Sequence, residues 1–240
     1  MPRRVRHFRF FLQRTQMIPE QLAALIDHTA LKPETTPAQI EQLCREALDH
    51  QFWSVCVNPL YVPLVEQILS GSSVKICTVV GFPLGASATA TKADETRWAM
   101  EQGAREIDMV LWIGGLKAGR YDGVERDVAA VARACGEGGA LLKVILECAL
   151  LTDEEKRRAC ELCVRAGAHY VKTSTGFGPG GATVEDVRLM SDIVKVYGLG
   201  VKAAGGIRSY PDAMRMIEAG ATRIGASASV KIIEEAQAAQ

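Results

Sequence analysis

The chain has 240 residues, with 28 Lys and Arg against 28 Asp and Glu, so that its formal net charge is zero. Hydrophobic residues make up 48% and charged residues 23%, which is ordinary for a globular protein. Because such a chain can bury roughly 70% of its unfolded surface, and no apolar run approaches the roughly 20 residues that span a bilayer, the sequence excludes a disordered chain, a collagen-like repeat and a membrane-spanning protein.

The first 16 residues carry a local excess of positive charge. They hold five arginines and no acidic residue, so the other 224 residues contain 23 basic and 28 acidic groups and sum to −5. The apolar stretch at 8–12 is interrupted by Arg9 and is shorter than the roughly 7–15 residues of a secretory signal. We expect 1–16 to be a basic extension outside the fold, with one domain over 17–240. The alternatives are a segment that binds nucleic acid or an anionic membrane, or one that packs on the fold or on a neighbouring subunit.

Seven cysteines, an odd number, are spread along the chain. Several lie in apolar surroundings, as Cys56 does between two valines, and we expect them to be small core residues. With no secretion signal, a reduced, cytoplasmic compartment is expected. Cys160 and Cys163 have C-x-x-C spacing, but they lie in a helical pattern without a second pair, which argues against a zinc or redox site.

Three segments repeat one order, namely an amphipathic stretch, a glycine turn and a short apolar run. The turn glycines are Gly103, Gly167 and Gly220. A glycine after the last helical turn supplies the left-handed conformation that ends many helices, and a buried parallel strand reads as a nearly continuous hydrophobic run. Each copy therefore predicts a helix followed by a strand.

The same rule, applied along the whole chain, predicts eight strands and eight helices. The strands are expected near 24–29, 53–57, 74–80, 106–112, 140–147, 169–173, 200–204 and 222–226. The helices are expected near 37–49, 60–70, 88–102, 122–137, 152–166, 183–197, 210–219 and 228–237, three of them capped by Thr36, Thr152 and Thr183. Strict alternation implies a parallel sheet, and eight units in this length favour a (β/α)8 TIM barrel over an open, doubly wound sheet.

In such a barrel the active site lies at the C-terminal ends of the strands. Polar side chains late in the expected strands are therefore the candidate site residues: Asp27, Thr29, Cys56, Asn58, Thr78, Asp108, Lys143, Glu147, Lys172, Thr173, Thr175 and Lys202. Charged groups among them must be paired or functional if they point into the barrel, since burying an isolated charge is costly.

Lys172 and Lys202 occupy matching places in consecutive strands, Tyr-Val-Lys-Thr and Gly-Val-Lys-Ala. Adjacent strands lie about 4.8 Å apart, so the two ammonium groups are expected to be neighbours. Like charge and desolvation both disfavour protonation, and a partly deprotonated lysine is the nucleophile that forms a Schiff base with a carbonyl substrate. The alternative is that each lysine simply pairs with an interior carboxylate, such as Asp108 or Glu147.

Glycine-rich segments follow the last three expected strands: Thr175-Gly176-Phe177-Gly178, Gly205-Gly206 and Gly225-Ala226-Ser227. Loops at this part of a barrel rim frequently bind phosphate through backbone N–H groups, which glycine allows to approach an anion closely. Together the three segments predict a phosphorylated substrate. The fingerprints of a nucleoside triphosphate or dinucleotide site are absent from the sequence.

Taken together, these residues resemble the deoxyribose-phosphate aldolase family, whose members are class I aldolases with a barrel fold. The resemblance runs in order across 20–232. It rests on Ile26-Asp27-His28-Thr29, Leu31-Lys32-Pro33, Val55-Cys56-Val57-Asn58-Pro59, Val80-Gly81-Phe82-Pro83-Leu84-Gly85, Glu106-Ile107-Asp108-Met109-Val110, Leu142-Lys143-Val144-Ile145-Leu146-Glu147, Val171-Lys172-Thr173-Ser174-Thr175-Gly176, Val201-Lys202-Ala203-Ala204-Gly205-Gly206-Ile207-Arg208 and Arg223-Ile224-Gly225-Ala226-Ser227.

The resemblance implies the reversible aldol cleavage of 2-deoxy-D-ribose 5-phosphate to acetaldehyde and D-glyceraldehyde 3-phosphate, in deoxyribonucleoside catabolism. It makes Lys172 the Schiff-base lysine, Lys202 the neighbour that disfavours its protonation, and Asp108 the group that drives proton transfer through an ordered water. The substrate-binding residues that it implies are Asp27, Cys56, Lys143, Thr175, Gly176, Gly205, Gly206, Gly225 and Ser227. Ala228 stands where some relatives have a second serine, which removes one side-chain contact to phosphate.

The sequence favours neither a metal nor another cofactor. A metal-dependent aldolase needs clustered histidines, whereas two of the four in this chain, His7 and His50, lie outside the expected strands. Nothing marks a partner for the pyridinium nitrogen of pyridoxal phosphate. We expect a phosphosugar and acetaldehyde as partners, no nucleic acid or membrane, and a homodimer or higher homo-oligomer, as is common for this family. The alternatives are another lysine-imine aldolase of the transaldolase type and an inactive barrel that senses phosphosugars.

Overall fold

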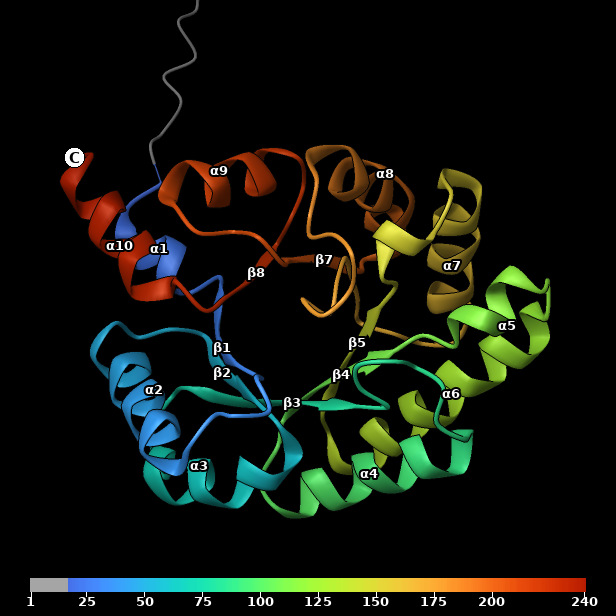
Figure 1. Ribbon diagram of the computed structural model, residues 1–240, viewed down its shortest axis with the longest axis horizontal. Coiled ribbons are helices and arrows are strands. Elements are labelled where there is room, and N and C mark those ends of the chain that lie inside the picture. The colour runs from blue at the N-terminus through green and yellow to red at the C-terminus, as the bar shows by residue number, and fades with distance from the viewer. Residues whose placement is uncertain (1–16) are drawn as a thin grey trace, which may run out of the picture.

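The computed structural model describes residues 17–240, in which eight parallel strands close into a barrel in sequence order, with β1 hydrogen-bonded to β8 (Figure 1). The strands are β1 (Ile26–Ala30), β2 (Ser54–Val57), β3 (Lys75–Val80), β4 (Glu106–Val110), β5 (Leu141–Ile145), β6 (Tyr170–Lys172), β7 (Gly200–Ala204) and β8 (Arg223–Ala226). Seven of them lie within the ranges expected from the sequence, β1 extends one residue beyond its expected range of 24–29, and the predicted TIM barrel is confirmed. The predicted extension at 1–16 lies outside the described residues.

Helices form a ring outside the strands (Figure 1). They are α1 (Pro19–Ala23), α2 (Pro37–Asp49), α3 (Val62–Leu69), α4 (Thr89–Glu101), α5 (Ile113–Lys117), α6 (Tyr121–Gly138), α7 (Asp153–Arg165), α8 (Val184–Val194), α9 (Tyr210–Glu218) and α10 (Ser229–Ala238), with 3-10 turns η1 (Pro59–Tyr61), η2 (Cys148–Leu150) and η3 (Lys195–Tyr197). All eight expected helices are present. The sequence missed α1 and α5, which have only five residues each and so are too short to show a helical period.

Local chemistry fixes the ends of several helices where the sequence placed them. The hydroxyl oxygens of Thr36 and Thr152 accept hydrogen bonds from the third helical N–H of α2 and α7, in the capping boxes that the sequence predicts. After α4, α7 and α9 the chain turns through Gly103, Gly167 and Gly220, whose φ angles are 115°, 84° and 111°. Glycine adopts these left-handed values without a steric penalty, and the chain can enter the next strand directly.

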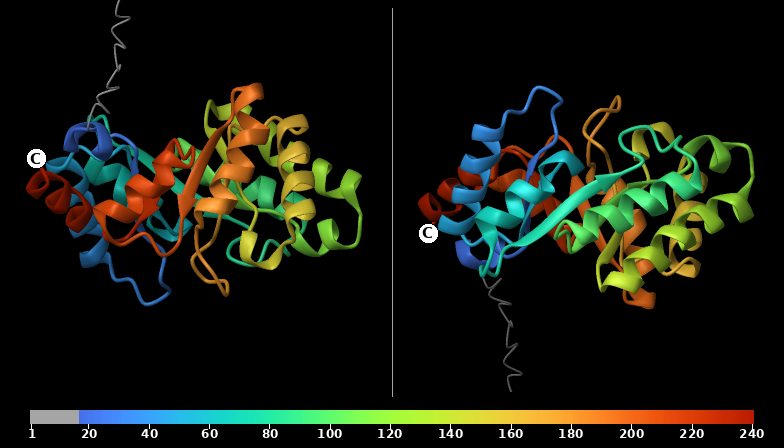
Figure 2. Two further views of the ribbon diagram at one scale, coloured as in Figure 1. Left: turned by 90° about the horizontal axis from the view of Figure 1, so that it is seen from above. Right: turned by 90° about the horizontal axis from the view of Figure 1, so that it is seen from below.

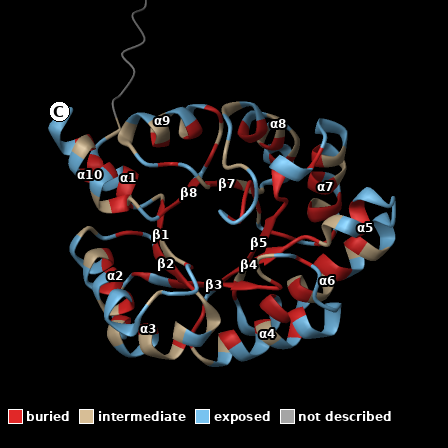
Figure 3. Ribbon diagram, viewed as in Figure 1, coloured by how far each residue is buried: buried red, intermediate tan, exposed pale blue. Residues whose placement is uncertain are grey.

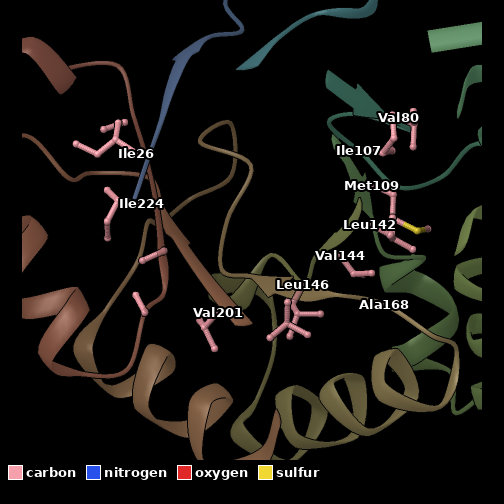
Figure 4. Packing of buried hydrophobic residues seen from close by; sticks show 14 of the residues in the cluster. Ile26, Val80, Ile107, Met109, Leu142, Val144, Leu146, Ala168, Val201 and Ile224 are labelled. Carbon is pink, nitrogen blue, oxygen red and sulfur yellow. The ribbon is translucent and has the colours of Figure 1, made fainter. Parts of the chain in front are cut away.

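Side chains alternate between the inside of the barrel and the layer between strands and helices. The strands are buried along most of their length (Figure 3). In β4 and β5, Ile107, Met109, Leu142 and Val144 pack outward in the main hydrophobic core (Figure 4), whereas the charged residues between them point into the barrel. This alternation follows from the two-residue period of a strand. The apolar core therefore surrounds the barrel, and its inside is left for polar groups.

The loops after β1 and β6 project from the same end of the barrel, as both views of Figure 2 show. This end is the mouth formed by the C-terminal ends of the parallel strands. All seven cysteines are buried and unpaired, as the sequence predicts, and Cys160 and Cys163 lie inside α7. Within 17–240, no helix has the length and apolarity required to cross a lipid bilayer.

A buried ion pair joins α4 to α6 behind the mouth. The fully buried Lys92 ammonium lies 2.6 Å from Asp127 Oδ2 and donates to the carbonyl oxygen of Val110, at the end of β4, at 3.0 Å. Asp127 Oδ1 also accepts from the Thr89 hydroxyl at 2.7 Å. The end of β4 is thus held in place by a charge that cannot reach solvent.

We expect Lys92→Ala to lower the free energy of unfolding by about 3–5 kcal/mol, because it leaves the Asp127 carboxylate buried without its cation. Urea denaturation followed by circular dichroism measures this change. Lys195→Ala removes an exposed ion pair with Asp192 and serves as the control, whose denaturation midpoint should stay unchanged. Equal losses in the two variants would contradict the assigned role of Lys92.

Candidate active site

Seven charged side chains fill the barrel interior, and we call them the interior charge cluster. They come from six of the eight strands, and each is at most 3% exposed: Asp27, Glu106, Asp108, Lys143, Lys172, Lys202 and Arg223. The parallel register sets Lys172 beside Lys202, and Asp108 beside Lys143. The sequence-predicted neighbourhood of the two lysines is confirmed.

Asp108 lies at the centre of the cluster and contacts three ammonium groups. Its Oδ2 accepts hydrogen bonds from the Nζ atoms of Lys172 and Lys202, each at 2.7 Å, and its Oδ1 accepts from Lys143 Nζ at 2.7 Å. Both lysines on β6 and β7 therefore share one carboxylate oxygen. Lys172 and Lys202 are therefore both adjacent to each other and paired with a carboxylate, so each of the two sequence-based predictions is confirmed.

Two further carboxylates contact Lys202 and Lys143 inside the barrel. Asp27 Oδ2 lies 2.5 Å from Lys202 Nζ, and Glu106 Oε2 lies 2.7 Å from Lys143 Nζ. One Arg223 nitrogen donates to both carboxylates, to Asp27 Oδ1 at 2.8 Å and Glu106 Oε2 at 2.9 Å. The ion pairs therefore run without interruption from Arg223 to Lys172.

The charges hold one another in their ionised forms. Burial acts to raise the pKa of Asp108, but the ammonium groups of Lys143, Lys172 and Lys202 hold it well below its usual value of 3.8. Burial likewise opposes ionisation of Lys202, yet Asp108 and Asp27 raise its pKa above the usual 10.5. The pKa of Lys143 is raised in the same way, against burial and mainly by Asp108. Lys202 is thus a fixed positive charge beside Lys172.

The interior is less basic than the lysines alone suggested. The sequence predicts three lysines at the mouth. The structure adds Arg223, and three carboxylates face these four cations, which leaves an excess of one positive charge. Glu147 does not pair with a lysine. Instead, one of its carboxylate oxygens accepts from the hydroxyl and the backbone N–H of Thr175.

Two buried thiols complete the polar interior. Cys56 and Cys77 are partners across β2 and β3, and Cys77 Sγ lies 3.3 Å from Asp108 Oδ1. A hydrogen bond from the Cys77 thiol lowers the pKa of Cys56, which burial opposes. Asp27, Glu106 and Cys77 are close enough together to ligate a cation, but Lys143 Nζ contacts all three, at 3.5, 2.7 and 3.1 Å. An ammonium group thus supplies the positive charge there.

The glycines predicted to bind phosphate gather at the mouth, but they do not play one role. Gly176, Gly205 and Gly206 have φ angles of 88°, 90° and 80°, which only glycine adopts readily, and they shape the loops after β6 and β7. Gly225 instead lies within β8, where a Cβ atom would come within 2.9 Å of Lys202 Cε. Its absent side chain leaves room for Lys202, and the exposed Ser227 follows it at the rim.

The sequence did not identify Arg223 and Glu106 as interior residues. Each is the first residue of its strand, and a charged residue there is normally expected to reach solvent at the closed end of the barrel. The two-residue period of a strand could have identified them, because Glu106 lies two residues before the inward-facing Asp108 and Arg223 lies two residues before Gly225. Trp53 was also missed, although its indole N–H donates to Glu106 Oε1 at 2.6 Å.

Comparisons with known proteins agree with this geometry. The family model described as DeoC/LacD family aldolase matches residues 21–233. The chain is 57% identical to the deoxyribose-phosphate aldolase of Carboxydothermus hydrogenoformans, covering 89% of this chain and 94% of that one. It is 58% identical to deoxyribose-phosphate aldolase 1 of Bacillus licheniformis, covering 90% and 96%. A tetrameric deoxyribose phosphate aldolase from Aeropyrum pernix superposes with a TM-score of 0.87 at 36% identity, covering 92% and 93%.

The interior charge cluster should make folding stability depend on pH in both directions. The pKa values of Asp108 and Asp27 lie below the usual 3.8, so their contribution to stability is present above that pH and is lost as the pH falls through the lowered values. The pKa values of Lys143 and Lys202 lie above 10.5, so theirs is complete below 10.5 and is lost as the pH rises through the raised values.

The expected thermal unfolding midpoint, followed by circular dichroism, is therefore nearly constant between about pH 5 and 9 and falls on either side. Asp27→Asn removes one of the acidic groups and should flatten the decline at low pH. An acid decline that is equally steep in this variant would contradict a role for Asp27 in it.

Proposed function

The chain belongs to the DeoC/LacD family of aldolases, and from that membership we propose that it catalyses the reversible cleavage of 2-deoxy-D-ribose 5-phosphate to acetaldehyde and D-glyceraldehyde 3-phosphate through a lysine Schiff base. The observation that carries the mechanism is the pairing of Lys172 with Asp108 and Lys202 inside the mouth of the barrel. A lysine held beside a permanent cation and a carboxylate has the surroundings that imine chemistry requires.

Lys172 is the nucleophile in this proposal. Its neutral Nζ attacks the C1 aldehyde of the open-chain sugar, and loss of water leaves a protonated imine that bears the positive charge previously carried by the ammonium group. Asp108 Oδ2, which contacts Lys172 Nζ at 2.7 Å, then faces an iminium in place of an ammonium. The total charge next to the carboxylate is therefore the same before and after imine formation, and the surroundings need little reorganisation.

Cleavage then breaks the C2–C3 bond. A base takes the proton from the C3 hydroxyl, the C3–O bond becomes a carbonyl, and the C2–C3 electron pair moves into the iminium to form an enamine. We assign the proton transfers to Asp108, acting through an ordered water. Protonation of the enamine at C2 and hydrolysis of the resulting imine release acetaldehyde and regenerate Lys172. The protein supplies the electron sink in this scheme.

The remaining interior groups hold Asp108 and Lys202 in place. Lys143 and Asp27 contact Asp108 and Lys202 respectively, at 2.7 and 2.5 Å, and we propose that they fix the positions of those two residues beneath the substrate. Cys56 lines the β2 side of the same interior, and no chemical step is assigned to its thiol. These groups are buried on all sides by the barrel, which keeps their geometry fixed.

Phosphate binding is assigned to the rim after β6, β7 and β8. Gly176, Gly205 and Gly206 let backbone N–H groups approach the anion, and Gly225 positions the chain before Ser227. Ser227 is exposed and offers a hydroxyl, whereas Ala228 offers only its backbone. Thr175 contributes by shaping the loop, since its hydroxyl is bonded to Glu147.

The setting of the enzyme follows from the same family membership. We propose that residues 17–240 form one catalytic domain, because the family match at 21–233 spans nearly all of it, and that 1–16 lie outside it. Seven buried, unpaired cysteines favour a reducing, cytoplasmic compartment. The tetramer of the Aeropyrum pernix relative supports a homo-oligomer, and the small-molecule substrates imply no nucleic acid or membrane partner.

Acetaldehyde with sodium borohydride should trap an N-ethyl group on Lys172, because hydride reduces the imine carbon to a stable secondary amine. Peptide mass spectrometry identifies the modified residue. Lys172→Ala should abolish both the label and turnover of 2-deoxy-D-ribose 5-phosphate, whereas Lys75→Ala, at an exposed position that begins β3, should keep both.

Three results would redirect the assignment. A label on another lysine would displace Lys172 as the nucleophile. Labelling by a ketose phosphate but not by acetaldehyde would favour a transaldolase-type aldolase. A wild-type chain that binds the sugar phosphate without turnover would be a phosphosugar sensor.

Ser227→Ala should raise the KM for 2-deoxy-D-ribose 5-phosphate by about tenfold, since a hydrogen bond to a charged group contributes roughly 1.5–3 kcal/mol. Cleavage of unphosphorylated 2-deoxy-D-ribose should stay at the wild-type rate, because that substrate makes no phosphate contact. Steady-state kinetics with both sugars measure the difference. If both substrates lost activity equally, Ser227 would act on the fold or on catalysis and not on the phosphate.

A further inference from the structure

Arg223 lies at the end of the interior charge cluster farthest along the chain of ion pairs from Lys172. Three residues lie between them along one path, on which Arg223 contacts Asp27, Asp27 contacts Lys202, and Lys202 and Lys172 both contact Asp108. Within 17–240, no hydrogen bond or ion pair joins Arg223 directly to Lys172, so any effect of Arg223 on Lys172 must act through the other charges.

The surroundings of Arg223 fix a positive charge at this depth. Its guanidinium lies 4.5 Å from the ring centre of Trp53 and 5.3 Å from that of Tyr170, and both contacts favour the cation. Burial acts against the charge, but Asp27 and Glu106 raise the pKa of Arg223 above its already high usual value. Arg223 thus remains charged wherever the enzyme is folded.

The three lysines differ in the number of carboxylates that they contact. Lys143 Nζ lies within 3.5 Å of three carboxylates, and Lys202 Nζ contacts two. Within the described part of the chain, Lys172 Nζ contacts one carboxylate oxygen, and it shares that oxygen with Lys202. With four cations and three carboxylates in one desolvated interior, Lys172 is the cation with the fewest carboxylate contacts.

We propose that Arg223 is a positioning residue for the nucleophile: it supplies the fourth interior cation, and the resulting excess of positive charge keeps Lys172 ready to release its proton and attack the substrate. The proposal rests on the proposed function, since it assigns the nucleophile to Lys172. Arg223 takes no part in bond making, and it acts by occupying Asp27 and Glu106, which would otherwise be free to neutralise Lys202 and Lys143 more completely.

Other groups around Lys172 do not supply this charge. Asp108 on β4 and Lys202 on β7 contact it, Lys143 on β5 contacts the same carboxylate, and the thiols of Cys56 and Cys77 face the interior from β2 and β3. The three lysines are equal in number to the three carboxylates Asp27, Glu106 and Asp108, so the excess charge comes with Arg223. Removing Arg223 would therefore make the interior neutral, and removing one carboxylate would leave it with two excess positive charges.

The test measures how pH controls imine formation, using acetaldehyde and borohydride trapping on the full chain. Arg223→Met should move the midpoint of the acid limb of the trapping rate upward by about one pH unit, which is about a tenfold loss of rate on the acid side. Glu106→Gln should move the midpoint downward by a similar amount. The double variant, with three cations and two carboxylates, should return the midpoint close to that of the wild type.

Arg223→Lys separates charge from packing. A lysine keeps the positive charge but loses the planar guanidinium that contacts two carboxylates and two rings, so the variant should unfold at a lower temperature while the midpoint of the acid limb stays in place. Should Arg223→Met fail to fold, as judged by circular dichroism, the comparison of Glu106→Gln with Arg223→Lys still decides the question.

The outcomes separate this inference from the proposed function. If the wild type forms no acetaldehyde imine on Lys172, the proposed function fails. If it forms the imine but Arg223→Met and Glu106→Gln leave the midpoint unchanged, or move it in the same direction, Arg223 has only a structural role and the inference is overturned. Opposite shifts that cancel in the double variant support it, because damage to packing does not change sign with charge.

Discussion

One buried carboxylate, that of Asp108, determines the arrangement of the barrel interior. Three ammonium groups converge on its two oxygens at 2.7 Å, and all four residues are buried. Without Asp108, Lys172 would lose the one carboxylate that it contacts within 17–240, while Lys143 and Lys202 would keep Glu106 and Asp27. A buried ammonium group without a counter-ion costs several kcal/mol. Glu106 and Asp27 provide further carboxylate contacts to Lys143 and Lys202, and Arg223 donates to both of these carboxylates.

Only a closed barrel brings these groups together. Arg223 and Asp27 are 196 positions apart in sequence, and they meet because β8 pairs with β1. In an open sheet those two strands would form opposite edges, and the Asp27 carboxylate on β1 would not reach the cations on β7 and β8. Barrel closure and assembly of the charge cluster are therefore the same structural event, and the outward-facing valines, leucines and isoleucines contribute the apolar burial that stabilises it.

The sequence predicts the elements well because their signals are local. Alternating strands and helices, threonine caps and glycine turns each depend on neighbouring residues, and they place all eight strands correctly. The adjacency of Lys172 and Lys202 follows from the equal positions of the two residues in successive strands. The partners of those lysines do not follow, since Arg223 and Glu106 begin their strands and meet only through barrel closure, over 117 positions of sequence. Likewise, the position of Thr175 in the sequence does not reveal that its hydroxyl donates a hydrogen bond to the Glu147 carboxylate.

The number of buried charges is itself an argument about function. Ion pairs buried in this way contribute little net stability, since the attraction between the charges is about as large as the free energy lost on removing them from water. Replacing such pairs with apolar side chains of similar volume often leaves a protein equally stable. Seven such residues inside one barrel are therefore not explained by folding. They are explained by a reaction in which Lys172 must exchange an ammonium for an iminium within a fixed electrostatic frame, because groups already in place need not reorganise when the charge changes its carrier. The neutral overall composition conceals this frame, since what acts on the substrate is the arrangement of the charges and not their sum.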